Sequence, residues 1–198
     1  LSGFSASANL SVVGSPSADS MNLNIDRSST LTGNLTLTMN AGDDTFNSSK
    51  LKNGDSVDMG AGNDTISLML TGSNGTPTIA NANLAKLDGG AGIDTLQFNE
   101  SGSFTGTLTL TTAGATNFEN IQGTYGAETI QGDANSNSLD GYAGGNDTLL
   151  IYEPYSDFTV TTLEGITRIV GKYTAGNYAF DEIVATNVES VKFSDRTI

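Results

Sequence analysis

Two stretches of the sequence place glycine, aspartate and threonine at the same spacing. Residues 57–67 read VDMGAGNDTIS and residues 87–97 read LDGGAGIDTLQ. Both contain Gly-x-Gly-x-Asp-Thr followed by an aliphatic residue, and a second aliphatic residue lies nine positions before that one. Glycine accepts positive φ and can turn backbone carbonyls towards one side. Carbonyl and carboxylate oxygens are the ligands that Ca²⁺ takes, so the pattern predicts the binding of a hard cation.

Looser copies of this pattern occur along the chain. LTMNAGDDTF (37–46), GTYGAETI (123–130) and LDGYAGGNDTL (139–149) keep an acidic residue two positions before an apolar residue. A degenerate copy, GSPSADSM (14–21), ends its turn at Asp19. Together with a weaker series at Asp55 and Asn137, the motifs give these candidate cation ligands: Asn40, Gly42, Asp44, Gly60, Gly62, Asp64, Gly90, Gly92, Asp94, Gly126, Glu128, Asn137, Gly145 and Asp147.

The spacing of the acidic positions predicts a flattened coil of stacked circuits. Successive acids lie 25, 20, 30, 34 and 19 residues apart, and some intervals are close to twice the nine-residue period. Asp55 and Asn137 lie nine residues from Asp64 and Glu128. Each circuit is therefore expected to have two turns joined by short strands, with longer loops in the longer circuits.

The segments between the motifs read as β-strands. LTLTM (35–39) and TLTLTT (107–112) alternate apolar residues with threonine, which is the pattern of a half-buried strand. ISLML (66–70) and TLLIY (148–152) are short apolar runs typical of more deeply buried strands. No segment carries a 3.6-residue apolar stripe over three turns, so we expect an all-β chain with very little helix.

The composition limits the classes of partner and chemistry. The chain has 198 residues, 8 Lys+Arg against 22 Asp+Glu, and a net charge of −14, which disfavours nucleic acid and anionic membrane surfaces. No apolar run is long enough to span a bilayer. The absence of histidine and cysteine excludes disulfides, the usual zinc ligands and histidine-based nucleophiles. The ligands that remain are oxygens, which suit Ca²⁺.

The stretch 89–97 resembles the repeats-in-toxin family, whose nonapeptide is Gly-Gly-x-Gly-x-Asp-x-U-x with a large aliphatic U. Gly89, Gly90, Gly92, Asp94 and Leu96 occupy every fixed position. The resemblance implies a parallel β-roll in which several Ca²⁺ ions sit between successive turns. It also implies that Asp94 is a side-chain ligand and that Gly90 and Gly92 mark carbonyl-donating positions.

The other copies depart from the family pattern at single positions. Met59 replaces the first glycine of the motif that ends at Asp64, and Asn40 stands where a glycine is usual. Glu128, Asn137 and Asp147 match by position, with a substitution or an inserted residue. The resemblance covers about 40–198.

The same resemblance sets the expected domains. Residues 1–150 are expected to form a calcium-binding β-solenoid and 151–198 a C-terminal β cap. Within the first range, the mixed small, polar and apolar residues LSGFSASANLSVV (1–13) are expected to be an exchanged or linker strand. The tail is similar to the closing segment that often follows such repeats in proteins exported by type I secretion. ATNFENI (115–121) and ATNVESV (185–191) repeat each other, which predicts a shared local structure.

The leading hypothesis is a non-enzymatic, extracellular protein at the cell surface that folds on Ca²⁺ and self-associates as a surface-layer, filament or adhesin subunit. Its widely spaced circuits resemble surface-layer members of the family more than toxin tails, and solenoid edges can pair with neighbours. The alternative is a C-terminal secretion and folding module of a larger secreted enzyme or toxin. The absence of histidine and of clustered catalytic residues disfavours an enzyme.

Three further features have an ordinary interpretation beside a functional one. The acidity favours solubility, yet about five Ca²⁺ would offset about ten charges. Threonines 36, 38, 107, 109 and 111 suit the solvent side of strands, although such rows bind ice or a cell-surface glycan in some proteins. The cluster of Tyr152, Glu153, Tyr155 and Asp157 is better explained by packing of the cap on the last circuit than by a sugar site.

Overall fold

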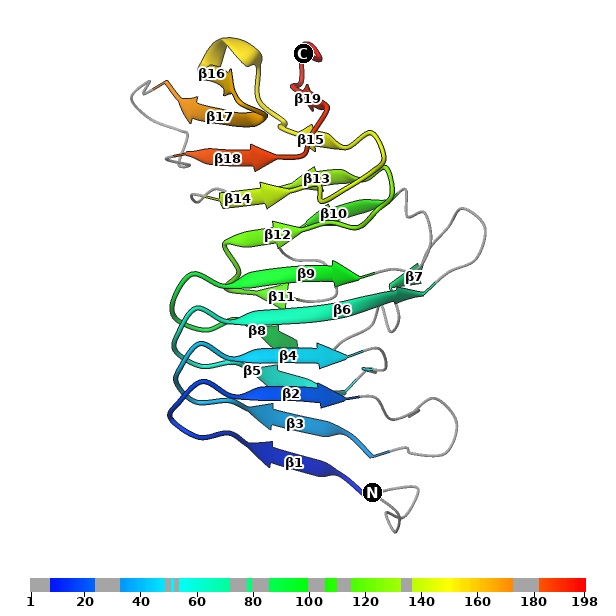
Figure 1. Cartoon of the computed structure of the whole chain (residues 1–198), viewed down its shortest axis with the longest axis vertical. Helices are drawn as coiled ribbons and strands as arrows, with labels where there is room; N and C mark the ends of the chain where they lie inside the picture. The colour runs from blue at the N-terminus through cyan, green and yellow to red at the C-terminus, as the bar shows by residue number, and fades with distance from the viewer. Residues whose placement is uncertain are drawn as a thin grey trace. The chain divides into compact units, whose positions relative to one another are not determined.

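The computed structural model describes residues 8–23, 33–48, 51, 54–71, 78–79, 86–99, 106–109, 115–132, 137–172 and 182–198. Over these residues the chain is all-β, with mostly parallel strands in stacked sheets and antiparallel strands near the C-terminus (Figure 1). This arrangement is β-solenoid-like, as the repeat predicted. No helix within the described ranges is long and apolar enough to cross a membrane.

Contacts divide the chain into two compact units. The first unit comprises 1–72, 78–99 and 111–118, and the second comprises 73–77, 100–110 and 119–198. The boundary expected at residue 150 remains a prediction.

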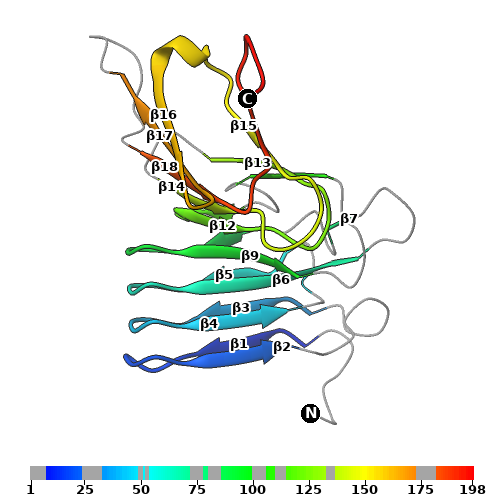
Figure 2. The same ribbon diagram turned by 45° about the horizontal axis from the view of Figure 1, so that its top comes forward.

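The first unit contains two parallel sheets, seen as two layers in Figure 2. One has the order β1 (Leu10–Val13), β3 (Leu35–Thr38), β5 (Ser56–Asp58), β8 (Lys86–Asp88) and β11 (Ala115–Thr116). The other contains β2 (Ser20–Leu23), β4 (Thr45–Ser48), β6 (Thr65–Thr71) and β9 (Thr95–Asn99), with β7 (Thr78–Ile79) antiparallel to β6.

The apolar residues of the motifs form the core of the first unit. Phe46, Ile66 and Leu96, each two positions after a motif acid, are in register on neighbouring strands and are 0% exposed. Val57 and Leu87, nine residues before Ile66 and Leu96, are in register on the other sheet and are also 0% exposed. The nine-residue interval therefore spans one strand, one turn and the start of the next strand.

The second unit continues the same construction. One of its sheets has parallel strands β12 (Asn120–Gln122), β14 (Asn137–Asp140) and β18 (Ile183–Thr186), followed by antiparallel β17 (Ile166–Gly171) and β16 (Phe158–Leu163). The other has β10 (Thr107–Thr109), β13 (Thr129–Gln131), β15 (Thr148–Leu150) and β19 (Ser190–Lys192), all parallel. A 3₁₀ turn, η2, spans Tyr155–Asp157.

Part of the segment expected as a cap belongs to the parallel stack. β18 pairs with β14 and β19 pairs with β15, so the ATNVESV segment forms a further circuit of the second unit. Its turn and that of ATNFENI share a geometry: Asn117 and Asn187 have φ of 57° and 52°. The Nδ2 atoms of these asparagines donate to the carboxylates of Asp88 and Asp140 at 2.7 Å.

Candidate cation sites

The glycine-rich motifs form turns at one edge of the first unit (Figure 1). Adjacent turns touch directly: the N–H groups of Ala61 and Ala91 donate to the carbonyls of Asn40 and Gly60 at 2.8 Å. A Cβ on Gly60 would lie 2.0 Å from the Asn40 oxygen, and φ there is +98°, so only glycine fits. The positive φ expected of the motif is therefore present, and it serves close contact between turns.

The motif acids of the first unit form a column that crosses the turns, which we call acid column 1: Asp19, Asp44, Asp64 and Asp94. In each pair the Oδ1 atom of one acid accepts the backbone N–H of the acid in the preceding turn. The N···O distances are 2.6 Å for Asp19–Asp44, 2.7 Å for Asp44–Asp64 and 2.7 Å for Asp64–Asp94. The column thus fixes the register of successive circuits.

Acid column 2, in the second unit, contains Glu128, Asp147 and Glu189. The N–H of Glu128 donates to Asp147 Oδ1, and that of Asp147 donates to Glu189 Oε2, both at 2.7 Å. Thr124 adds a hydroxyl hydrogen bond to Glu128 Oε1. The substituted and expanded copies of the motif are therefore equivalent in structure to the complete ones.

Each column holds buried carboxylate oxygens that, with the acids ionised, have no hydrogen-bond donor among the described residues. Asp44, Asp64, Glu128 and Asp147 are each 1% exposed. The Oδ2 or Oε2 atom of each accepts no hydrogen bond from the described residues. Two ion pairs of the described residues, Arg168–Glu182 and Arg196–Asp195, lie outside the columns. A buried carboxylate without a counter-charge is costly, so these oxygens need a proton or a cation.

The titration of the columns reflects this burial. Burial raises the pKa of Asp64. The hydrogen bond from the Asp44 N–H lowers this pKa, but the nearby charges of Asp44 and Asp43 raise it again, and the net shift is upward. Burial, followed by hydrogen bonding with the Glu128 carboxyl, raises the pKa of Asp147 to about 7. Both acids therefore resist ionisation when no cation is bound.

The remaining candidate ligands fall into two groups. Gly42, Gly62, Gly90, Gly92, Gly126 and Gly145 lie in the turns beside the columns, and each takes part in or follows a turn–turn contact. Asp55 and Asn137 lie at the other end of β5 and β14 from those turns. Asp55 Oδ1 accepts the Leu35 N–H at 2.7 Å, so this second series also bridges circuits, at a separate edge.

Sequence reasoning missed one member of acid column 2 and a separate side-chain ladder in the turns of the first unit. Glu189 was not counted because its turn lacks glycine, although it precedes the buried Val191 by two residues as the other acids precede theirs. Asp43 and Asn63 form a second side-chain ladder: their Oδ1 atoms accept the N–H groups of Asn63 and Ile93 at 2.8 and 3.0 Å. The Asp-Asp and Asn-Asp pairs in the motifs were the available signal.

The donor set fits Ca²⁺ with carboxylates as its charged ligands. No three acidic side chains of the described ranges are placed to hold an ion by themselves. A bound cation would therefore take its other ligands from backbone carbonyls or water. Among the described residues, the carbonyls of Asn40 and Gly60 each accept one backbone hydrogen bond, and a carbonyl oxygen has two lone pairs, so a second lone pair on each could face a cation.

The other residues that the sequence singled out lie away from the columns. Thr36 and Thr38 are on β3 of the first unit, whereas Thr107 and Thr109 are on β10 of the second; Thr111 is outside the described residues. The Tyr155 ring packs edge-on against Phe193 at 5.2 Å, directly after β19. That contact agrees with the packing interpretation of the tyrosine cluster.

The fold and the columns define an all-β protein of mostly parallel strands in stacked sheets. No model of a known protein family matches the chain. No curated protein matches its sequence significantly.

Proposed function

We propose that the chain is an extracellular, cell-surface, calcium-binding structural protein of the repeats-in-toxin type that folds on Ca²⁺ and self-associates. The observation that carries this proposal is the buried, unsatisfied carboxylate oxygens of the two columns in a chain with a net charge of −14. Asp44, Asp64, Glu128 and Asp147 would hold the ions. Bound Ca²⁺ would neutralise the buried charge and link adjacent turns.

The columns explain why folding should depend on the cation. Without it, the acids of neighbouring turns are ionised near neutral pH in the unfolded chain and must be buried close together on folding. Extracellular calcium is high enough to fill sites of about 10⁻⁴ to 10⁻³ M, which is typical of extracellular modules. An acidic chain of this kind would stay unfolded where calcium is scarce and fold outside the cell.

A calcium titration of the purified chain tests the proposal. Far-UV circular dichroism and light scattering are recorded together, starting from a chelated sample, with Mg²⁺ as the matched cation control. A coil-to-β transition with Ca²⁺ and a rise in scattering supports calcium-dependent assembly of a surface layer, filament or adhesin. The same transition with flat scattering favours a secretion and folding module. A chain that is folded in chelator and unchanged by Ca²⁺ contradicts the proposal.

A further inference from the structure

Strand β16 forms an open edge of the antiparallel hairpin β16–β17. It pairs with β17 on one side, from Phe158 opposite Gly171 to Leu163 opposite Ile166. No strand of the described residues pairs with its other side. Thr161, Thr162 and Leu163 are exposed, so nothing described covers this edge.

The sequence of β16 contains none of the features that usually protect an edge strand. Natural edges carry charges, proline or bulges that prevent pairing with another chain. β16 reads FTVTTL, which is uncharged, has no proline and has high β-propensity. Exposed apolar side chains lie on both strands of the hairpin: Leu163 of β16 is 74% exposed, and Ile166 and Val170 of β17 are 39% and 40% exposed.

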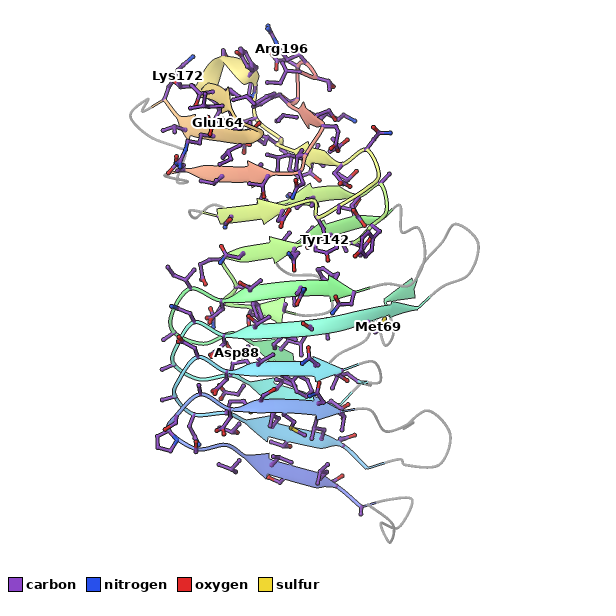
Figure 3. All side chains as sticks on the ribbon, in the orientation of Figure 1. Met69, Asp88, Tyr142, Glu164, Lys172 and Arg196 are labelled. Carbon is purple, nitrogen blue, oxygen red and sulfur yellow. The ribbon has the colours of Figure 1, made fainter. Side chains whose placement is uncertain are left out.

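The hairpin turn shows which backbone groups point to the open edge. Glu164, labelled in Figure 3, and Gly165 have φ of 52° and 79°, so the two-residue loop has positive φ at both positions. Leu163 and Ile166 close such a loop as a hydrogen-bonded pair, and bonded and non-bonded pairs alternate along the strand. The N–H and C=O groups of Val160 and Thr162 therefore point away from β17.

We propose that this edge pairs with β16 of a second copy of the chain, antiparallel and about a two-fold axis. The outward groups fix the register, with Val160 opposite the second copy's Thr162, and Thr161 opposite the second copy's Thr161. Each Val160–Thr162 pair exchanges two backbone hydrogen bonds. The axis passes between the two Thr161 residues.

A second copy fits this edge because the hairpin is complementary to itself. In this register Leu163 lies opposite the second copy's Thr159, which is in register with Val170 of that copy. The exposed Leu163 and Ile166 of one chain would thus form one continuous apolar surface with the exposed Val170 of the other. No charge lies within either paired strand, so the six residues of β16 bring no like charges together across the contact.

The inference deepens the self-association in the proposed function, but it uses none of the cation ligands. A two-fold contact is isologous and closes at two copies. A filament or layer would therefore need a second contact elsewhere on the chain.

Cysteine cross-linking tests the register, because the chain contains no cysteine. Thr161→Cys places two thiols across the axis at a non-hydrogen-bonded pair, where Cα atoms are about 4.5 Å apart and a disulfide can form. We expect mild oxidation to give a covalent dimer. Thr159→Cys, on the same strand but away from the axis, and Thr36→Cys, at an exposed position of β3 in the first unit, are the controls. Equal cross-linking of all three, or none at 161, overturns the proposal.

Edge-blocking variants test the contact without cross-linking. Thr162→Pro removes the outward N–H, whereas Thr162→Val keeps it and controls for loss of the Thr162–Thr167 hydroxyl contact of 3.1 Å. Thr161→Lys adds a charge at the edge, and Thr36→Lys adds the same charge elsewhere. By analytical ultracentrifugation, Thr162→Pro and Thr161→Lys should weaken dimerisation at least about tenfold relative to their controls.

The calcium titration of the same samples separates this inference from the proposed function. A native chain that folds with Ca²⁺ and stays monomeric at high concentration overturns the β16 contact and leaves calcium binding intact. A dimer that is sensitive to Thr162→Pro in a chain indifferent to Ca²⁺ supports the contact and contradicts the calcium proposal.

Discussion

Replacing Gly60 with alanine tests whether adjacent turns touch directly. A Cβ on Gly60 would lie 2.0 Å from the Asn40 carbonyl oxygen, whereas ordinary contact begins at 3.4 Å. The two turns must therefore separate by about 1.4 Å. Two backbone–backbone hydrogen bonds join the turns beside Gly60, from Ala61 N to Asn40 O and from Gly42 N to Ala61 O, both 2.8 Å long. Both would open on separation.

The expected cost follows from these contacts. Each lost backbone hydrogen bond contributes about 1 kcal/mol, and alanine at positive φ costs about 1 kcal/mol more. We therefore expect Gly60→Ala to lower the free energy of unfolding by about 3 kcal/mol. Gly165→Ala is the matched control, because φ is +79° there and nothing lies within 4 Å of the added Cβ. Gly165→Ala should lower the free energy of unfolding by about 1 kcal/mol or less.

The two variants are compared by urea unfolding at one saturating Ca²⁺ concentration, followed by circular dichroism. Hydrogen exchange of peptides from 39–64 locates the loss in the first unit. The 6 tyrosines all lie at 125 or beyond, so their fluorescence reports on the second unit. If Gly60→Ala costs no more than Gly165→Ala, the direct contact between turns is wrong.

Three other changes test the columns and the turns that follow them. Asp64→Ala and Asp94→Ala should raise the Ca²⁺ concentration at the folding midpoint, whereas Asp157→Ala, outside the columns, should leave it unchanged; equal midpoints would contradict the ligand assignment. In chelator, the folded pKa of Asp147, about 7, exceeds the ordinary 3.8, so its contribution to stability is fully present below 3.8 and is lost as pH rises through 7. Tyrosine fluorescence of the chelated chain should therefore show more of the folded second unit below pH 3.8 than above pH 7, and Asp147→Asn should reduce that difference. Asn187→Ala removes a side-chain hydrogen bond and places alanine at φ 52°, so it should lower the free energy of unfolding by about 2 kcal/mol. Asn187→Gly removes only the hydrogen bond and should lower it by about half as much, as measured by thermal unfolding.

The sequence predicted the rows of the core and the edge that carries the acids. The interval of nine from Val57 to Ile66, and from Leu87 to Leu96, is a geometric requirement of a strand–turn–strand unit, so it is visible without a structure. The alternating threonines identified β3 and β10 for the same reason. These features depend on local periodicity alone.

The contact between turns could not be predicted from the same residues. A cation between turns and a direct hydrogen bond between turns both require glycine at Gly60 and an acid at Asp64. The structure shows that Asp64 Oδ1 accepts the Asp44 N–H, while Oδ2 has no hydrogen-bond partner among the described residues. The motif therefore identifies the carboxylate, but not how its two oxygens divide their roles. The pairing of β17 with β18 was equally hidden, because it depends on residues distant in sequence.

The degenerate motif at 14–21 shows that the glycines of the other motifs allow adjacent turns to touch. Gly42 packs on the preceding turn, with its missing Cβ only 2.5 Å from Ser17 and Ala18. Ser17 holds the equivalent place in the 14–19 turn, and no described turn lies beneath it. Pro16 stands where Ala61 donates its N–H to the preceding turn, and proline has no N–H to donate. Both departures of the 14–19 turn, Pro16 and Ser17, therefore fall where the described residues make no contact with an earlier turn, which indicates that glycine and a backbone N–H are required at these places only where two turns touch.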